Sequence, residues 1–115
     1  MIAVIFEVLP KASGKQEYLD IAGELKQHLS TIDGFISIER FQSLVDPDKI
    51  LSLSFWKTEE AVSKWRNLEA HRMAQSKGRA KLFEDYRIRV ATITRDYSRN
   101  ERVQVPEDSL QVHAN

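Results

Sequence analysis

Residues 2–9 form a run of β-branched and aromatic side chains that stops at Pro10, a pattern that predicts a β-strand. Neighbouring side chains of a strand point to opposite faces. One face carries Ile2, Val4, Phe6 and Val8, and the other carries Ala3, Ile5, Glu7 and Leu9. Both faces are mainly apolar, so both need cover. If helices cover one face, the second face must be covered by a ligand cavity, another sheet or a partner subunit.

The next segment changes from strand to helix periodicity. Apolar side chains recur at helical spacing over residues 15–30, which predicts an amphipathic helix. Asp33-Gly34 is a turn signal before a second strand over residues 35–45. In that strand Phe35, Ser37, Glu39 and Phe41 share one face, and Ile36, Ile38 and Arg40 share the other.

A third strand is predicted over residues 50–56, after a hairpin connection at Asp46-Pro47-Asp48. Its two faces differ in character. Leu51, Leu53 and Phe55 form an apolar face, whereas Ile50, Ser52, Ser54 and Trp56 form a mixed one. A mixed face is typical of the wall of a polar-lined cavity.

A second helical region follows, with Thr58 as the expected cap and two glutamates in the first turn. Its apolar stripe predicts a helix to about Glu69 and a separate helical piece over residues 70–76. We expect a break at Gly78 and a short turn over residues 80–83. A fourth strand is predicted over residues 86–97. The remaining residues 98–115 are too polar to fold alone, so this tail is either disordered or packed on a partner subunit.

The order β-α-β-β-α-β predicts an α+β fold of the ferredoxin-like type over residues 1–97. Four antiparallel strands carry the helices on one face. The other face stays bare, and along the first strand it is apolar. An exposed apolar sheet face is a large patch for a soluble monomer, so we expect a homodimer that closes the two sheets into a barrel.

Composition excludes several classes of protein. The 115 residues hold 17 Lys plus Arg against 17 Asp plus Glu, which argues against nucleic-acid or anionic-membrane binding. No cysteine is present, which excludes disulfides and thiolate chemistry. The histidines are too scattered to predict a metal site. With no signal peptide and no membrane-spanning run, we expect a cytoplasmic protein.

Residues 65–72 concentrate the chemistry, with Trp65, His71 and Arg72 on about two helical turns. His71 is a candidate general base; otherwise it is a helix-end histidine that bonds a backbone carbonyl. Trp65 either walls a pocket or belongs to the core. Arg72, if turned inward, holds an anionic oxygen; otherwise it lies on a solvated face.

The strands add further candidates. Glu7 interrupts an apolar strand, where it is a second candidate base; the alternative is an ion pair with Arg40, Arg87 or Arg89. Trp56 lines a pocket or closes the core. Ser37 and Ser54 are candidate pocket residues, although serine on a half-buried strand needs no function.

These residues together resemble the antibiotic biosynthesis monooxygenase family of the dimeric α+β barrel superfamily. The matching pieces fall in order across about residues 2–97: Asp33-Gly34-Phe35, residues 53–57, residues 58–61 and residues 65–71. The resemblance implies a pocket in each subunit between the sheet and the second helical region. Members include cofactor-independent monooxygenases of phenolic polyketides, quinol oxygenases and haem-degrading enzymes.

Haem degraders of this family carry a strand-one Asn, a helix Trp and a haem-ligating His about ten residues further on. Here Trp65 matches the Trp. The strand-one position holds Glu7 or its neighbour Phe6, and Gln75 stands where the His is expected. Three functions follow: a cofactor-independent monooxygenase of a small planar aromatic or quinol-like substrate, a haem-binding protein with His71 as ligand, or a non-catalytic dimeric ligand-binding or stress protein.

Overall fold

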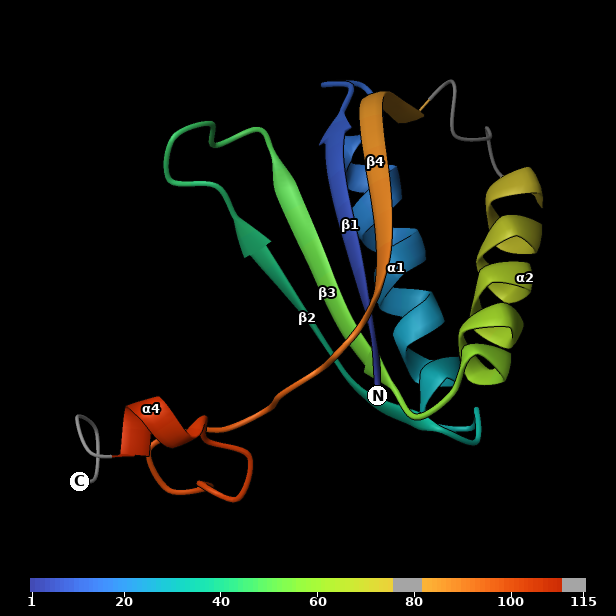
Figure 1. The fold of residues 1–115 in the computed structure, drawn as a ribbon. Helices are drawn as coiled ribbons and strands as arrows, with labels where there is room; N and C mark the ends of the chain where they lie inside the picture. Colours follow the sequence, from blue (N-terminus) through green and yellow to red (C-terminus); the bar gives the residue numbers. More distant parts are fainter. Residues whose placement is uncertain (76–81, 111–115) are drawn as a thin grey trace.

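The computed structural model describes residues 1–75 and 82–110. Its main elements follow the predicted β-α-β-β-α-β order, as Figure 1 shows. They are β1 (Ile2–Pro10), α1 (Lys15–Leu29), β2 (Phe35–Gln42), β3 (Ile50–Trp56), α2 (Glu59–Gln75) and β4 (Phe83–Thr92), with a last short helix α4 (Glu107–Leu110).

The four strands form one antiparallel sheet in the order β2-β3-β1-β4. Helices α1 and α2 both lie on one side of it, and neither of them covers the other side (Figure 1). The predicted ferredoxin-like α+β fold is therefore confirmed. We call the side toward α1 and α2 the helix face, and the opposite side the open face.

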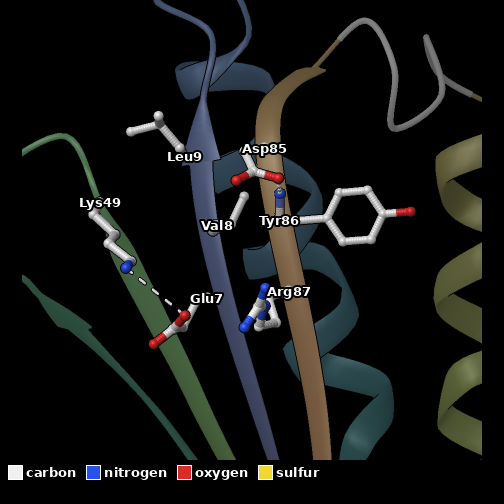
Figure 2. A pocket seen from close by; sticks show the side chains of 7 residues that line it. All are labelled: Glu7, Val8, Leu9, Lys49, Asp85, Tyr86 and Arg87. Atoms are coloured by element: carbon white, nitrogen blue, oxygen red, sulfur yellow. Dashed lines mark hydrogen bonds and ion pairs between the residues drawn. The ribbon is translucent and has the colours of Figure 1, made fainter.

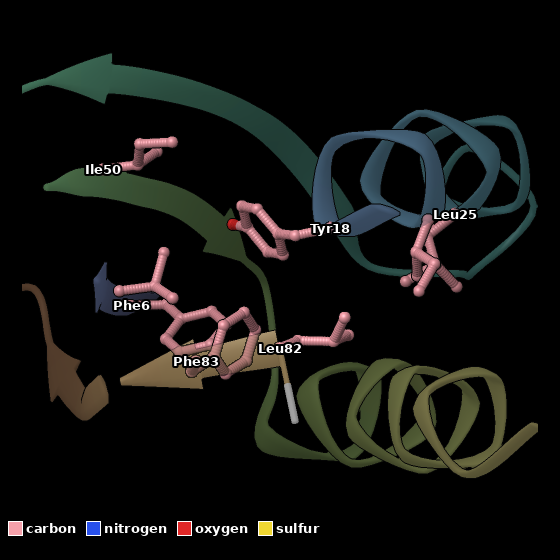
Figure 3. Packing of buried hydrophobic residues seen from close by; sticks show 8 residues of the cluster. Phe6, Tyr18, Leu25, Ile50, Leu82 and Phe83 are labelled. Atoms are coloured by element: carbon pink, nitrogen blue, oxygen red, sulfur yellow. The ribbon is translucent and has the colours of Figure 1, made fainter. Parts of the chain in front are cut away.

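The helix face carries the core, in two adjoining clusters. Around Phe6 of β1 and Tyr18 of α1 the rings meet edge to face, with Phe83 5.2 Å from Tyr18 between ring centroids (Figure 3). The second cluster centres on Trp56, which is fully buried between Phe35 and Trp65. The side chains that were predicted to form the mixed face of β3 therefore point into the interior.

The strand register arranges the side chains of the open face in three rows that run across the strands. They are Glu39–Leu53–Ile5–Arg89, Phe41–Leu51–Glu7–Arg87 and Ser37–Phe55–Ala3–Ala91, read from β2 through β3 and β1 to β4. The two central strands therefore supply mainly apolar side chains, and the charges gather toward the edges.

Two glycines are required by local geometry. Gly34 has φ +96°, a left-handed conformation that suits the predicted Asp33-Gly34 turn. At Gly14, a Cβ atom would lie 2.7 Å from the carbonyl oxygen of Leu82. Leu82 also accepts a hydrogen bond from the Lys11 amide at 2.8 Å, so this close approach ties the start of α1 to the start of β4.

Several predicted boundaries were wrong. α2 is one continuous helix, capped by a hydrogen bond from the Ala61 amide to Thr58 Oγ1 at 3.2 Å, instead of two pieces. β4 begins at Phe83 and ends at Thr92, because its ladder with β1 runs from Pro10 to Ile2, the first residue of that strand. β2 likewise stops at Gln42, where the hairpin to β3 begins. The break and turn predicted around Gly78 fall mainly on residues 76–81, outside the described residues.

The segment after Thr92 leaves the sheet beside the N-terminus, where the Ile93 amide donates to the Met1 carbonyl at 3.0 Å. It then turns on itself, burying Val105 and leaving Val103 fully exposed. α4 lies on the side of the sheet away from α1 and α2 (Figure 1). The radius of gyration is 16.7 Å, whereas a compact chain of this length has about 13 Å, so part of the chain projects outward.

Within residues 1–75 and 82–110, no helix is both long and apolar enough to cross a membrane.

Candidate functional site

An interior cavity lies between the helix face of the sheet and the two helices. Its apolar wall is Phe6, Ala22, Leu25, Leu29, Ile38 and Trp65, and its polar wall is Tyr18, Arg40, Ser52 and Glu69. These side chains come from β1, α1, β2, β3 and α2. The cavity measures about 20 Å³, room for about one water molecule, so a larger ligand requires the lining side chains to move.

Helical and strand periodicity bring the polar residues together. Trp65 and Glu69 are four residues apart and therefore share one face of α2. Arg40 and Ser52 are directly paired across β2 and β3 on the helix face. Tyr18 reaches down from α1 with its hydroxyl group directed away from the helix (Figure 3).

Tyr18 is the best-defined polar group of the cavity. Its side chain is 3% exposed, and its hydroxyl group is hydrogen-bonded to Arg40. Burial raises the pKa of Tyr18 above its ordinary value of 10.0. The Arg40 charge and hydrogen bond lower this pKa, and the Glu69 charge raises it, but desolvation is the largest influence. Tyr18 is therefore a neutral hydroxyl group at physiological pH.

Arg40 and Glu69 place opposite charges in the same cavity. Glu69 is only 3% exposed, and a buried carboxylate is costly unless its surroundings favour it. The Nε atom of Arg40 is buried and donates no hydrogen bond among the described residues. The cavity therefore combines an acid, a cation with a spare donor and a neutral hydroxyl group.

Trp65 lines the cavity, and Trp56 and Ser54, two other candidates from the sequence, lie beside it in the core. The Trp65 and Trp56 rings are 5.8 Å apart between centroids. The indole Nε1 of Trp56 donates to Ser54 Oγ at 2.9 Å, which satisfies both buried groups. Trp56 and Ser54 do not line the cavity, but they support the wall that Trp65 forms.

Glu7 lies on the open face, away from this cavity. Its carboxylate is 3.4 Å from Arg89 Nη1, one of the ion pairs raised as an alternative by the sequence, and 3.7 Å from Lys49 Nζ. It borders an open depression of about 260 Å³ at the end of the sheet (Figure 2). In the same view the Tyr86 ring points to the other side of β4.

The remaining predicted site residues also lie outside the cavity. His71 is exposed on α2, and Ser37 is exposed on the open face. Arg72 forms an ion pair with Glu24, which joins α2 to α1. The structure therefore does not bring His71, Glu7 and Trp65 to one place, and the catalytic roles predicted for His71 and Glu7 stay predictions.

No catalytic or ligand-binding role was predicted from the sequence for Tyr18, Arg40 or Glu69. One signal was present, because Arg40 shares a predicted strand face with two isoleucines, and a charge on an apolar face is unusual. Among the described residues, no group of three or more His, Cys, Asp or Glu side chains is arranged to hold a metal ion.

Fold and cavity together define a ferredoxin-like α+β domain whose interior site lies between the sheet and its helices. Comparison with known proteins agrees with this class. The family model described as antibiotic biosynthesis monooxygenase matches residues 1–77. The chain belongs to the antibiotic biosynthesis monooxygenase family.

Individual relatives differ in how much of their length is matched. The chain is 48% identical over 101 residues to jasmonate monooxygenase ABM of Pyricularia oryzae, covering 88% of this chain and 47% of that protein. It therefore spans about half the length of that relative. It is 30% identical over 94 residues to YqjZ of Bacillus subtilis, covering 81% of this chain and 79% of that protein.

Solved structures share the fold at low sequence identity. Rv0793 from Mycobacterium tuberculosis superposes with a TM-score of 0.71 at 15% identity, covering 84% of this chain and 98% of that one. At this identity the likeness establishes the fold alone.

Proposed function

We propose that this chain is a monooxygenase that binds a small, largely apolar ring molecule with an ionisable oxygen. The observation that carries this proposal is the interior cavity, whose apolar wall meets Arg40, Glu69 and Tyr18 at one end. Ligand sites are typically apolar with a few convergent polar groups. Family membership supports oxygen chemistry at this position.

Each polar residue has a distinct proposed role. Arg40 holds the substrate oxygen as an anion, because its buried Nε is a spare donor. Glu69 removes the substrate proton, since it is the one carboxylate among the described residues that line the cavity. Tyr18 donates a hydrogen bond from a hydroxyl group that burial keeps neutral. Trp65 lies flat against the ring.

The proposed reaction balances without an external reductant. Glu69 takes a proton from an acidic CH₂ or OH group, and the electron-rich anion transfers its electrons to dioxygen. One oxygen atom bonds to the substrate carbon, and loss of water leaves a carbonyl group. A CH₂ group and O₂ thus become a carbonyl group and H₂O, with all four electrons drawn from the substrate.

Two classes of candidate substrate should be assayed first. Phenols and quinols are the first group, because their anions are readily oxidised and an equivalent balance holds: a ring C–H and an O–H group react with O₂ to give two quinone carbonyl groups and H₂O. Jasmonates are the second group, since a jasmonate monooxygenase is 48% identical to this chain over 101 residues. A jasmonate is a cyclopentanone carboxylate, and its carboxylate fits Arg40. Hydroxylation of its alkyl chain needs two further electrons, so this arm is run with and without a nicotinamide reductant.

The test is aerobic turnover, followed as oxygen uptake and substrate loss. We expect Glu69→Gln to lower kcat about 100-fold or more, as for loss of a general base. We expect Arg40→Met to raise KM and Tyr18→Phe to have a smaller effect. Glu60→Gln, an exposed glutamate on α2, is the matched control. Full turnover by Glu69→Gln and Arg40→Met would reject the proposed site.

The same assay tests the bases predicted from the sequence. Loss of turnover in His71→Ala or Glu7→Gln, with Glu69→Gln active, would return catalysis to the predicted residues. Turnover unaffected by both substitutions would reject that mechanism.

Haem binding through His71 has less support from the geometry. The imidazole is exposed, and none of the described residues that line the cavity is a histidine. A hemin titration tests it, because a Soret band that persists in His71→Ala eliminates this ligand. A protein that binds the panel compounds but consumes no oxygen would favour the non-catalytic alternative.

We also propose that the working form is a homodimer joined through the open face. Members of the family are typically dimeric. On the open face, Ile5, Leu51, Leu53 and Phe55 are only partly covered, and Phe41 is 43% exposed. A continuous apolar patch of this kind marks an interface. Light scattering at micromolar concentration tests this, and a stable monomer would overturn it.

A further inference from the structure

An ion pair between Glu24 of α1 and Arg72 of α2 joins the two helices that enclose the cavity (Figure 1). Arg72 follows Glu69 by three residues on the same side of α2, and so lies about 5 Å further along the helix axis. Glu24 directly precedes Leu25, which lines the cavity from α1. We call Glu24 and Arg72 the rim pair, because they adjoin lining residues and are both partly exposed.

The rim pair is easily exchanged for another contact. Its side chains are 33% exposed at Arg72 and 44% exposed at Glu24. Ion pairs that solvent reaches contribute little to stability, because water solvates and screens both charges. The carboxylate of a bound molecule can therefore take the place of the Glu24 carboxylate at Arg72, while Glu24 turns to solvent.

Arg40, the cation inside the cavity, is less available to a permanent anion. Glu69 lies in the same cavity and is 3% exposed, so its charge cannot turn to solvent. Both charges act on the Tyr18 hydroxyl group, whose pKa Arg40 lowers and Glu69 raises. A second carboxylate there would set two buried negative charges against one arginine. In the proposed function, by contrast, the oxygen at Arg40 becomes negative only as Glu69 takes up its proton.

We propose that Arg72 binds a carboxylate of the substrate, and that Glu24 is the internal competitor for this position. The inference rests on the proposed function and deepens it by naming the substrate class. That class is a ring molecule whose ionisable oxygen enters the cavity and whose side chain ends in a carboxylate. The rim pair itself shows which group Arg72 accepts, because a planar guanidinium group matches a carboxylate.

Two phenols that differ in the charge of the side chain test this assignment. They are para-hydroxyphenylpropionate, an anion at neutral pH, and its uncharged methyl ester. Isothermal titration calorimetry without oxygen measures both dissociation constants, so that no turnover occurs. We expect the wild type to bind the acid more tightly than the ester.

Substitutions in the rim pair should act in opposite directions on the acid. Arg72→Met should weaken its binding about tenfold or more, through loss of charge-assisted hydrogen bonds. Glu24→Gln should strengthen it about two- to fivefold, because the competing carboxylate of the chain is removed. The affinity for the ester should stay the same in both variants.

The controls separate binding from a mechanical link between the helices. Arg66→Met, the same change at an exposed arginine of α2, should leave both constants unchanged, and circular dichroism verifies folding. If both rim variants shift the acid and the ester alike, the rim pair only joins the helices, and the proposal is overturned. A preference for the acid that is lost in Arg40→Met but kept in Arg72→Met would also overturn it.

The wild type gives a further decision. Equal affinity for the acid and the ester, or binding of neither, overturns the assignment of Arg72. Oxygen uptake with uncharged phenols tests the monooxygenase separately, because it does not depend on Arg72. Binding of the acid as described, without any oxygen uptake, would support the carboxylate site and overturn the oxygenase.

Discussion

The two faces of the sheet are built from alternate residues of the same strands, yet one is covered within the chain and the other is exposed. The helix face is covered by α1 and α2 and encloses Tyr18, Arg40 and Glu69. The open face exposes apolar rows with charges at their edges. Most side chains on the first face pack on one another within the chain, although Ile88 and Val90 on β4 are 37% and 51% exposed. Side chains on the open face are available to contact another molecule. Substitutions on one face should therefore change folding stability, and substitutions on the other should change association.

The largest effect is expected at the centre of the helix face. Trp56 is fully buried, and Trp56→Ala removes an indole from contact with Phe35 and Trp65. We expect a loss of about 3–5 kcal/mol in the free energy of unfolding, from lost burial and the cavity left behind. Urea denaturation measures it. Ile36→Ala, at a 43% exposed position, should cost less than about 1 kcal/mol. Equal costs would contradict the comparison.

The open face should respond in association instead. Leu53→Glu places a carboxylate among Ile5, Leu51 and Phe55 in the proposed interface. We expect the dimer dissociation constant to rise about 100-fold or more, which corresponds to roughly 3 kcal/mol. Sedimentation measures the constant, and urea denaturation of the dilute monomer should change little. A dimer unaffected by this substitution would place the interface elsewhere.

Alanine substitutions at two glycines, one before α1 and one within it, test how tightly the helical layer is packed. Gly14→Ala forces a Cβ against the Leu82 backbone, whereas Gly23 has no atom within 4 Å of the added Cβ. We expect Gly14→Ala to destabilise by about 1–3 kcal/mol. Gly23→Ala should stabilise by about 0.5–1 kcal/mol, because alanine is the better helix former. Thermal melts of both variants measure this, and the same sign for both would be the contrary result.

The smallest effect concerns Tyr18. Burial raises its pKa, so the folded state holds its proton above pH 10.0, where the unfolded chain releases it. Stability is therefore intact below pH 10.0 and falls as the pH rises toward the raised value. Tyr18→Phe should cost about 1 kcal/mol at neutral pH, through the lost hydrogen bond, and flatten the alkaline decline. Urea denaturation from about pH 8 to 11, on either side of the ordinary tyrosine pKa, measures the slope, with Tyr97→Phe as the exposed control.

Periodicity predicted the fold because strands and amphipathic helices leave local signals. β3 was predicted at its observed limits, since its apolar and mixed faces alternate strictly. The end of β4 could not be predicted, because it is set by where β1 begins, far away in the sequence. The polar residues of the cavity could not be predicted for the same reason. Tyr18, Arg40 and Glu69 come from three elements, and only register and helix rotation bring them together.

The size of the interior cavity has a kinetic consequence. A space of about 20 Å³ admits no ring molecule until the surrounding side chains part. The apparent affinity is then the intrinsic affinity reduced by the fraction of open molecules. Binding rates should level off with rising ligand concentration, at the rate of opening. The binding rates of compounds of different size would then depend first on how long the cavity stays open.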